Sequence, residues 1–248
     1  MDNVREHYER LLAKHYSWMV GTPFDVKVAE QRVILEDALR PFGTSSDRGL
    51  AVDLGCGPGF QTVALAQMGF APVIAVDVSA TLLSELRSHV RSLPIQPIED
   101  DIANLGALVA QGSAHAVVCM GDTITHLGSR SDVLALIRQV AKALTPGGAF
   151  VITYRDLSNE LTGLDRFILV QSDNDRVMTC FLEFDQPETV LVHDLVYCRE
   201  NAQWKLEKSN YRKLRLPVQW LEDTMTSAGF SVSRGQAGRL TRMVGQKL

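Results

Sequence analysis

The segment that fixes the architecture reads Val52-Asp53-Leu54-Gly55-Cys56-Gly57-Pro58-Gly59-Phe60. An apolar run precedes it and apolar residues at helical spacing follow it, which predicts a strand, a tight turn and a helix. Three glycines in five positions remove the side chains that would hold a ligand away from the backbone. Asp53, at the strand end, supplies a carboxylate that accepts hydrogen bonds from an ammonium group or from water. The spacing Gly-x-Gly-x-Gly differs from the Gly-x-Gly-x-x-Gly of dinucleotide-binding enzymes.

The second predicted strand spans residues 72–78, a continuous apolar run of the kind that is buried on both faces of a parallel sheet. It ends in Asp77, and a carboxylate at such a strand end can accept hydrogen bonds from two ribose hydroxyls. Ser79 is placed to cap the helix that follows. An acidic residue on the strand after the glycine-rich turn therefore strengthens the prediction of a nucleoside-binding site.

Strands and helices alternate along residues 50–153, which predicts a doubly wound α/β fold with a mostly parallel sheet. A turn over residues 145–148 is expected to feed the fifth strand. Between residues 156 and 216 the apolar pattern alternates within strands, and short polar turns separate these strands. Such short connections require antiparallel neighbours, so three or four strands form an inserted antiparallel sheet. A last helix and two strands, over residues 217–248, complete a seven-stranded central sheet.

The composition describes a globular chain of 248 residues, of which 46% are hydrophobic and 22% charged, with a net charge of −4. This charge gives no general electrostatic reason to bind nucleic acid or an anionic membrane. The four cysteines lack metal-ligand spacing, so no metal site is expected. With no apolar run of membrane-spanning length and no signal-peptide pattern, a cytoplasmic location is expected. Nothing in the composition distinguishes a monomer from a homo-oligomer.

From about Ala51 to Val151, and again near the C-terminus, the chain resembles the class I S-adenosylmethionine-dependent methyltransferases. The first motif of that family matches at Asp53, Gly55, Gly57 and Gly59. The resemblance implies that this loop wraps the methionine end of S-adenosyl-L-methionine. It places an acid that binds adenine at Asp101, with Asp100 as the alternative. The other cofactor contacts expected on this basis are Asp77, Val78, Ile102, Met120 and Tyr16.

Residues 119–127 and 154–156 look like the corresponding stretches of glycine N-methyltransferases and related small-molecule enzymes. In the glycine enzymes, an arginine at the position of Arg155 binds the carboxylate of the acceptor. Another arginine, at the position of Lys27, holds the carboxylate of the cofactor, so Lys27 is expected to do this as a single-point cation. The family has an asparagine where this chain has Asp122, and this departure argues against glycine as the acceptor.

The expected organisation is a single methyltransferase domain, residues 1–248. Its expected parts are a helical lid over residues 1–48, a cofactor-binding core over 49–155, the inserted sheet over 156–216 and a closing segment over 217–248. A loop from Pro41 to Gly49 joins the second helix to the first strand. The basic residues that cluster near the end of the insert are expected on a solvated strand face: Arg212, Lys213 and Arg215.

The sequence thus predicts methyl transfer from S-adenosylmethionine to a nitrogen or oxygen of a small-molecule acceptor. An in-line displacement needs alignment, exclusion of water and removal of one proton. His126 and Asp122 are the candidate bases, although His126 is also consistent with a histidine satisfied within its own loop. Asp122 and Arg155 are expected to converge beside the sulfonium methyl, or else to pair with each other. The alternative function is a non-catalytic protein that binds the same cofactor.

Overall fold

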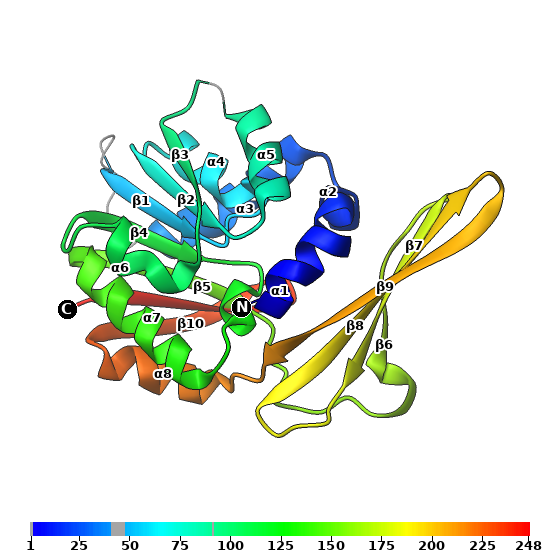
Figure 1. Cartoon of the computed structure of the whole chain (residues 1–248). Helices are drawn as coiled ribbons and strands as arrows, with labels where there is room; N and C mark the ends of the chain where they lie inside the picture. Colours follow the sequence, from blue (N-terminus) through cyan, green and yellow to red (C-terminus); the bar gives the residue numbers. More distant parts are fainter. Residues whose placement is uncertain (1, 41–47, 91) are drawn as a thin grey trace.

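The computed structural model describes residues 2–40, 48–90 and 92–248. Its central sheet has the order β10-β11-β5-β4-β1-β2-β3, shown in Figure 1. Five neighbouring strands are parallel, and β11 is antiparallel to both β5 and β10. The strands are β1 (Leu50–Leu54), β2 (Val73–Asp77), β3 (Ile95–Glu99), β4 (Ala114–Cys119), β5 (Leu144–Tyr154), β10 (Phe230–Ala237) and β11 (Leu240–Lys247). The predicted seven-stranded, mostly parallel sheet is confirmed.

Helices cover both faces of this sheet, because its strands are apolar on both sides. One core joins the sheet to α3 (Phe24–Leu39), α4 (Phe60–Gln67) and α5 (Ala80–His89). The opposite core joins it to α6 (Leu105–Leu108), α7 (Arg130–Ala143) and α8 (Val218–Ser227). Successive residues of β1 show the division, since Ala51 belongs to the first core and Val52 to the second. The doubly wound prediction is confirmed.

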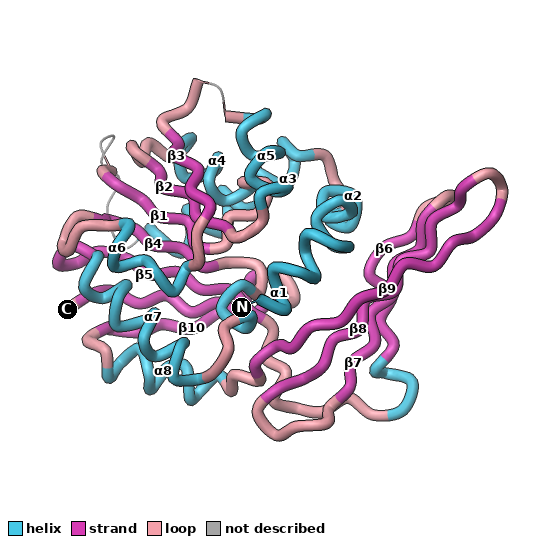
Figure 2. The backbone as a smooth tube through the Cα atoms, in the orientation of Figure 1, coloured by secondary structure: helices cyan, strands magenta, loops and turns pink. Residues whose placement is uncertain are grey.

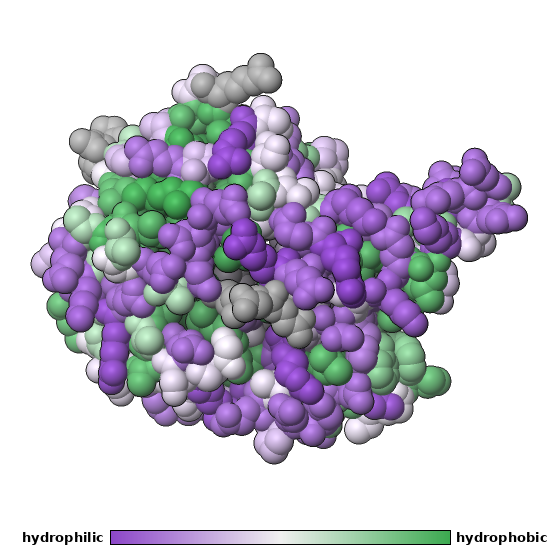
Figure 3. All heavy atoms as spheres, in the orientation of Figure 1, coloured by the Kyte–Doolittle hydropathy of each residue, from purple (hydrophilic) through white to green (hydrophobic). Residues whose placement is uncertain are grey.

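The second sheet is the inserted one, and its four antiparallel strands follow the order β6-β7-β8-β9. Figures 1 and 2 show it projecting from the central sheet, and the space-filling view shows that its projecting end is mostly hydrophilic (Figure 3). The strands are β6 (Phe167–Ser172), β7 (Arg176–Glu183), β8 (Thr189–Glu200) and β9 (Gln203–Leu214). The inserted antiparallel sheet is confirmed, although β9 ends two residues before the predicted Leu216.

The N-terminal segment, residues 2–20, is helical but not uniform. It consists of α1 (Asp2–His7), a π-helical turn (Tyr8–Leu12), a 3-10 turn (Ala13–His15) and α2 (Tyr16–Val20). Gly21, with φ of 74°, ends the run in the left-handed conformation. Figure 1 shows this segment in blue between the two sheets.

Residues 145–148, predicted as a turn, are included in a strand, although Gly147 has a φ of 75°, as a Pro-Gly turn requires. They belong to β5, which begins directly after α7. The pairing of β4 with β5 shifts register between Ala114–Leu144 and Ala116–Ala149. The strands pair on both sides of the shift, so the extra residues form an irregularity within β5. The predicted loop from Pro41 to Gly49 lies mostly outside the described residues. None of the described helices has the length and apolar character needed to cross a membrane.

Candidate active site

The glycine-rich loop leaves β1 and is held against β2. The amides of Gly55 and Cys56 both donate to the carbonyl of Val76, at 2.8 and 3.0 Å. Gly55 has φ of 72°, and a Cβ there would lie 2.3 Å from the side chain of Thr123. Gly59 also cannot carry a side chain, since its Cβ would lie 2.2 Å from Leu86. Gly57 differs, because a Cβ there would meet only atoms at 3.9 Å or beyond, so its backbone faces open space.

Asp77 fixes the loop from the neighbouring strand. One carboxylate oxygen accepts from the amide of Gly57 and the other from the amide of Ser79, both at 2.8 Å. Burial raises the pKa of Asp77 above its ordinary value, and these amides offset part of that rise. The sequence did not indicate that the predicted ribose ligand also orders the glycine-rich loop.

Asp53 lies beneath the loop. Its carboxylate accepts from the hydroxyl of Thr62 at 2.6 Å, which ties β1 to α4. Burial raises the pKa of Asp53 to about 7, against the lowering effect of the Thr62 hydrogen bond. Among the described residues it is Gly55 and Gly57, rather than Asp53, that line the adjoining cavity. A direct contact of Asp53 with the cofactor therefore stays a prediction.

The first cavity, with about 570 Å³ of empty space, lies over the loop. Its polar floor is made by Gly55, Gly57 and Asp77, and its apolar side includes Val78 and Ile102. The N-terminal segment covers it with the rings of Tyr8 and Tyr16. The geometry fits a nucleoside, because an open glycine backbone and a buried carboxylate face one space with apolar walls.

The N-terminal segment is anchored on one side to helix α5 and on the other to the inserted sheet. The carboxylate of Glu9 accepts from the hydroxyls of Ser79, at 2.6 Å, and Thr81, at 2.8 Å, at the start of α5. On its other side, Nε2 of His7 lies 3.0 Å from a carboxylate oxygen of Asp194 on β8. Neither contact was predicted. Together they hold the tyrosines over the cavity.

A second cavity, with about 950 Å³ of empty space, lies between the central and inserted sheets. It adjoins the first across four shared residues: Tyr8, Tyr16, Gly121 and His126. The predicted Asp122 and Arg155 both line it. The carboxyl end of the central sheet is the edge where open α/β folds bind ligands.

Asp122 is buried and fully engaged. One of its oxygens accepts from the backbone amide of Arg155, and the other from Nζ of Lys213 at 3.0 Å. Burial raises the pKa of Asp122, but Lys213 and Arg155 outweigh it and lower the pKa to about 2. The side chains of Asp122 and Arg155 are therefore not paired with each other. A carboxylate this acidic is a poor general base.

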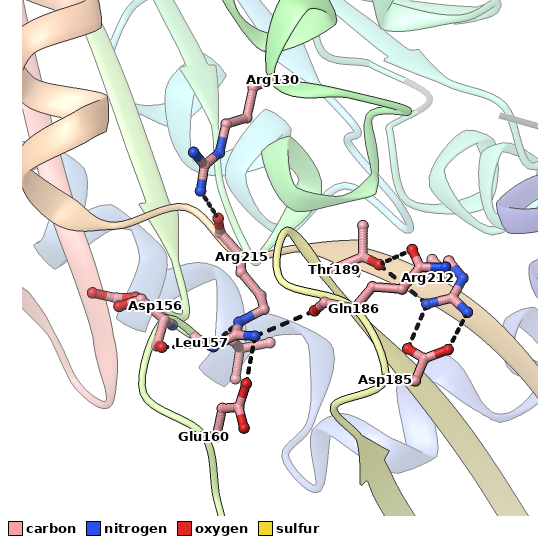
Figure 4. Close-up of polar contacts among 10 residues, drawn as sticks. Arg130, Asp156, Leu157, Glu160, Asp185, Gln186, Thr189, Arg212 and Arg215 are labelled. Carbon is pink, nitrogen blue, oxygen red and sulfur yellow. Dashed lines mark hydrogen bonds and ion pairs between the residues drawn. The ribbon is translucent and has the colours of Figure 1, made fainter.

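The basic cluster is not a solvated face, so that prediction is wrong for two of its members. Lys213 points into the second cavity, and its side chain is only 12% exposed. Arg215 is buried where the inserted sheet joins the core, and it donates to the carbonyl of Leu157 (Figure 4). It also donates to the carbonyl of Ser158. Arg212 alone lies on the surface, in a two-point pair with Asp185 (Figure 4).

His126 is buried at the junction of the two cavities. Its ring stacks on Tyr211 with centroids 5.3 Å apart and an interplanar angle of 5°. Burial, and then Lys213, lower the pKa of His126 to about 3, so the imidazole is neutral near pH 7. Its Nδ1 has no hydrogen-bond partner among the described residues. A neutral ring can accept a proton, but this low pKa makes it a weak base.

A third cavity adjoins the other two at Tyr16 and Gly121. Lys27 and Met120 line it, as expected for residues near the methionine end of a cofactor. Nζ of Lys27 lies 2.9 Å from the carboxylate of Glu30, one turn along α3. This exposed pair is weak, so Lys27 can bind a ligand carboxylate at little cost.

The two acids after β3 serve the local turn. Asp101 accepts from the amide of Ala103 at 2.8 Å, and Asp100 accepts from the side chain of Asn104 at 2.7 Å. Ile102, the residue that follows these two acids, is buried and lines the first cavity. The choice between Asp100 and Asp101 as the adenine ligand stays open. Among the described residues no group of three or more His, Cys, Asp or Glu side chains is arranged to hold a metal ion.

We expect Lys27→Met to weaken binding of S-adenosylmethionine by about tenfold, because one partly exposed charge-assisted contact is lost. Binding of decarboxylated S-adenosylmethionine should not change, since that analogue lacks the carboxylate. Calorimetry with both ligands measures the effect. Arg32→Met is the matched control, because Arg32 lies on the same helix in an exposed pair with Glu36. An equal loss for both ligands would contradict the assignment.

Comparisons with known proteins agree with this geometry. Residues 51–148 match a family model described as a methyltransferase domain. The putative methyltransferase YqeM of Bacillus subtilis (strain 168) is 24% identical over 192 residues, 76% of each chain. The cypemycin N-terminal methyltransferase of Streptomyces sp is 33% identical over 111 residues, but this match covers 44% of this chain and 43% of the relative. Among solved structures, the amino pentose methyltransferase CalS10 of Micromonospora echinaspora has a TM-score of 0.73 at 16% identity, over 95% of this chain and 96% of that one.

Proposed function

We propose that this chain, whose residues 51–148 match a methyltransferase domain, is a class I S-adenosylmethionine-dependent methyltransferase that methylates a nitrogen or oxygen of a small-molecule acceptor held in the second cavity. The observation that carries the proposal is the adjacency of the two cavities, which share Tyr8, Tyr16, Gly121 and His126. The second cavity has mostly apolar walls and a few charged groups, which is the lining typical of a small-molecule site. N-methyltransferases among the relatives support the same acceptor class.

The first and third cavities are proposed to hold the cofactor. Asp77 and the backbone of Gly57 would bind its nucleoside, with Ile102 and Val78 against the base. Lys27 would bind its carboxylate, and Tyr16 and Met120 would lie near its sulfur. When bound, the cofactor supplies the methyl group from its sulfonium centre. Tyr8 and Tyr16 cover this junction and keep water from it, which a displacement by a neutral nucleophile requires.

Arg155 is proposed to bind an anionic group of the acceptor. Lys213 is paired with Asp122, whereas the Arg155 guanidinium, which lines the same cavity, has no ion-pair partner in the described part of the chain. A planar guanidinium binds a carboxylate or phosphate in two-point fashion. With Asp122 held as an anion by Lys213, His126 is the remaining candidate to take up the proton. Because its pKa of about 3 makes His126 a weak base, we expect the reacting nitrogen or oxygen of the acceptor to be deprotonated before the methyl group is transferred.

The proposal is tested by measuring S-adenosylhomocysteine formation with panels of amino acids, amino sugars and hydroxylated metabolites. We expect turnover on at least one small acceptor, reduced at least a hundredfold in Arg155→Met with cofactor affinity intact, since a charge-assisted contact is lost. Arg212→Met is the control, because Arg212 is bound to Asp185 on the surface. Methylation confined to RNA or protein substrates would overturn the small-molecule proposal.

A further inference from the structure

The inserted sheet presents two different faces. Alternate side chains of β6, β7 and β8 line the second cavity, and nearly all of them are apolar: Ile168, Val170, Met178, Leu182 and Val192. The register aligns them in rows across the strands, with Leu182 opposite Val192 and Val192 opposite Tyr211. Leu12 and Met19 of the N-terminal segment form a facing apolar wall.

Charged groups gather at the end of this cavity that joins the core. Lys213 lies one residue from the end of β9, where it meets Asp122. Met178, which lines the far end of the cavity, pairs with Val196 of β8. Val196 in turn pairs with Glu207, which precedes Lys213 on β9 by six residues. At 3.2–3.4 Å per residue, the apolar wall therefore extends roughly 20 Å from the charged end. The one carboxylate within the wall, Asp194, is already bound to His7 at 3.0 Å.

We propose that the acceptor is amphipathic: its reactive amine or hydroxyl and its anionic group lie at the charged end, and an aliphatic or aromatic body lies along the inserted sheet. This inference rests on the proposed function and narrows it. An amino acid as small as glycine would leave most of this apolar lining without a contact to the ligand. Apolar walls bind a hydrocarbon body because both surfaces leave water.

The test uses straight-chain L-2-amino acids, from alanine to 2-aminooctanoate, which keep one amine and one carboxylate while the apolar part grows. Each is titrated by calorimetry into the protein saturated with S-adenosylhomocysteine. Affinity should rise about fourfold per added methylene, the factor expected for burial of one CH₂ group. The heat-capacity change of binding should become more negative along the series. Equal affinity along the series, or no measurable binding of 2-aminooctanoate, would overturn the inference.

Two neighbouring residues of β6 provide a variant and its control. Val170 lines the cavity and is 36% exposed, whereas Leu169 does not line it and is 63% exposed. Neither residue belongs to a buried core cluster, so a polar side chain at either position should leave the core intact. Val170→Asp should flatten the dependence of affinity on chain length, and Leu169→Asp should leave it unchanged. Equal effects in the two variants would place the apolar body elsewhere and contradict the proposal.

The outcomes separate this inference from the proposed function. Methylation of small polar acceptors, together with a flat binding series, would refute the amphipathic acceptor and leave the proposed function standing. Rising affinity along the series, without methyl transfer to any small molecule, would instead refute the proposed function and leave an apolar ligand site.

Discussion

Replacing Asp77 with alanine is expected to weaken binding of S-adenosylhomocysteine by roughly 30-fold to 1,000-fold, equivalent to about 2–4 kcal/mol. Two charge-assisted hydrogen bonds to the ribose would be lost. In addition, the amides of Gly57 and Ser79 would lose the carboxylate that now accepts from them. Calorimetric titration of the purified variant measures the effect.

Glu99→Ala is the matched control for Asp77→Ala. Glu99 lies opposite Asp77 in the parallel register of β2 and β3, but it forms an exposed pair with Arg5. Its removal should change cofactor affinity by less than about threefold, since exposed pairs contribute little. Asp77→Asn separates the two roles, because an amide keeps one acceptor oxygen for the loop. Unchanged affinity in Asp77→Ala would remove Asp77 from the site.

The sequence predicted those parts of the molecule that depend on local pattern. Continuous apolar runs identified β1 and β2 as buried parallel strands, and Asp53 and Asp77 follow from their ends. Period-two alternation identified the inserted sheet. The glycine spacing located the loop, although it did not separate Gly57, which faces the cavity, from Gly59, which packs against Leu86.

Contacts between distant segments could not be predicted in the same way. Lys213 and Asp122 are 91 positions apart, and their meeting depends on how the inserted sheet docks onto the core. One signal was available: in a strand, Lys213 shares a face with Tyr211, and both point into the second cavity. The contacts of Glu9 with α5 have no such signal, because they depend on the irregular turns of the N-terminal segment.

Replacing Lys213 with methionine is expected to lower the free energy of unfolding by about 3 kcal/mol at pH 7, because a buried carboxylate loses its cation. In the parent protein the pKa of Asp122 is lowered from 3.8 to about 2. Its ion pair therefore stabilises the fold fully above pH 4, and this stabilisation is lost as the pH falls through about 2. Without Lys213 the effect of burial is less fully offset, so the pKa of Asp122 is higher than in the parent protein and the carboxyl takes up a proton at a higher pH.

The destabilisation in Lys213→Met should therefore be largest at neutral pH and should narrow as the pH falls from about 4 towards 2. Urea unfolding at pH 7 and pH 3.5 measures the difference. The double variant Asp122→Asn/Lys213→Met has no carboxyl to titrate at this site, so its loss of stability should be smaller at pH 7 and should vary with pH only through the titration of Asp122 in the parent protein. Lys205 lies on the same strand as Lys213, and Lys205→Met, which breaks an exposed pair with Glu200 of β8, should cost less than about 1 kcal/mol. A loss in Lys213→Met that is equal at both pH values would show that Lys213 does not hold Asp122 in its charged form.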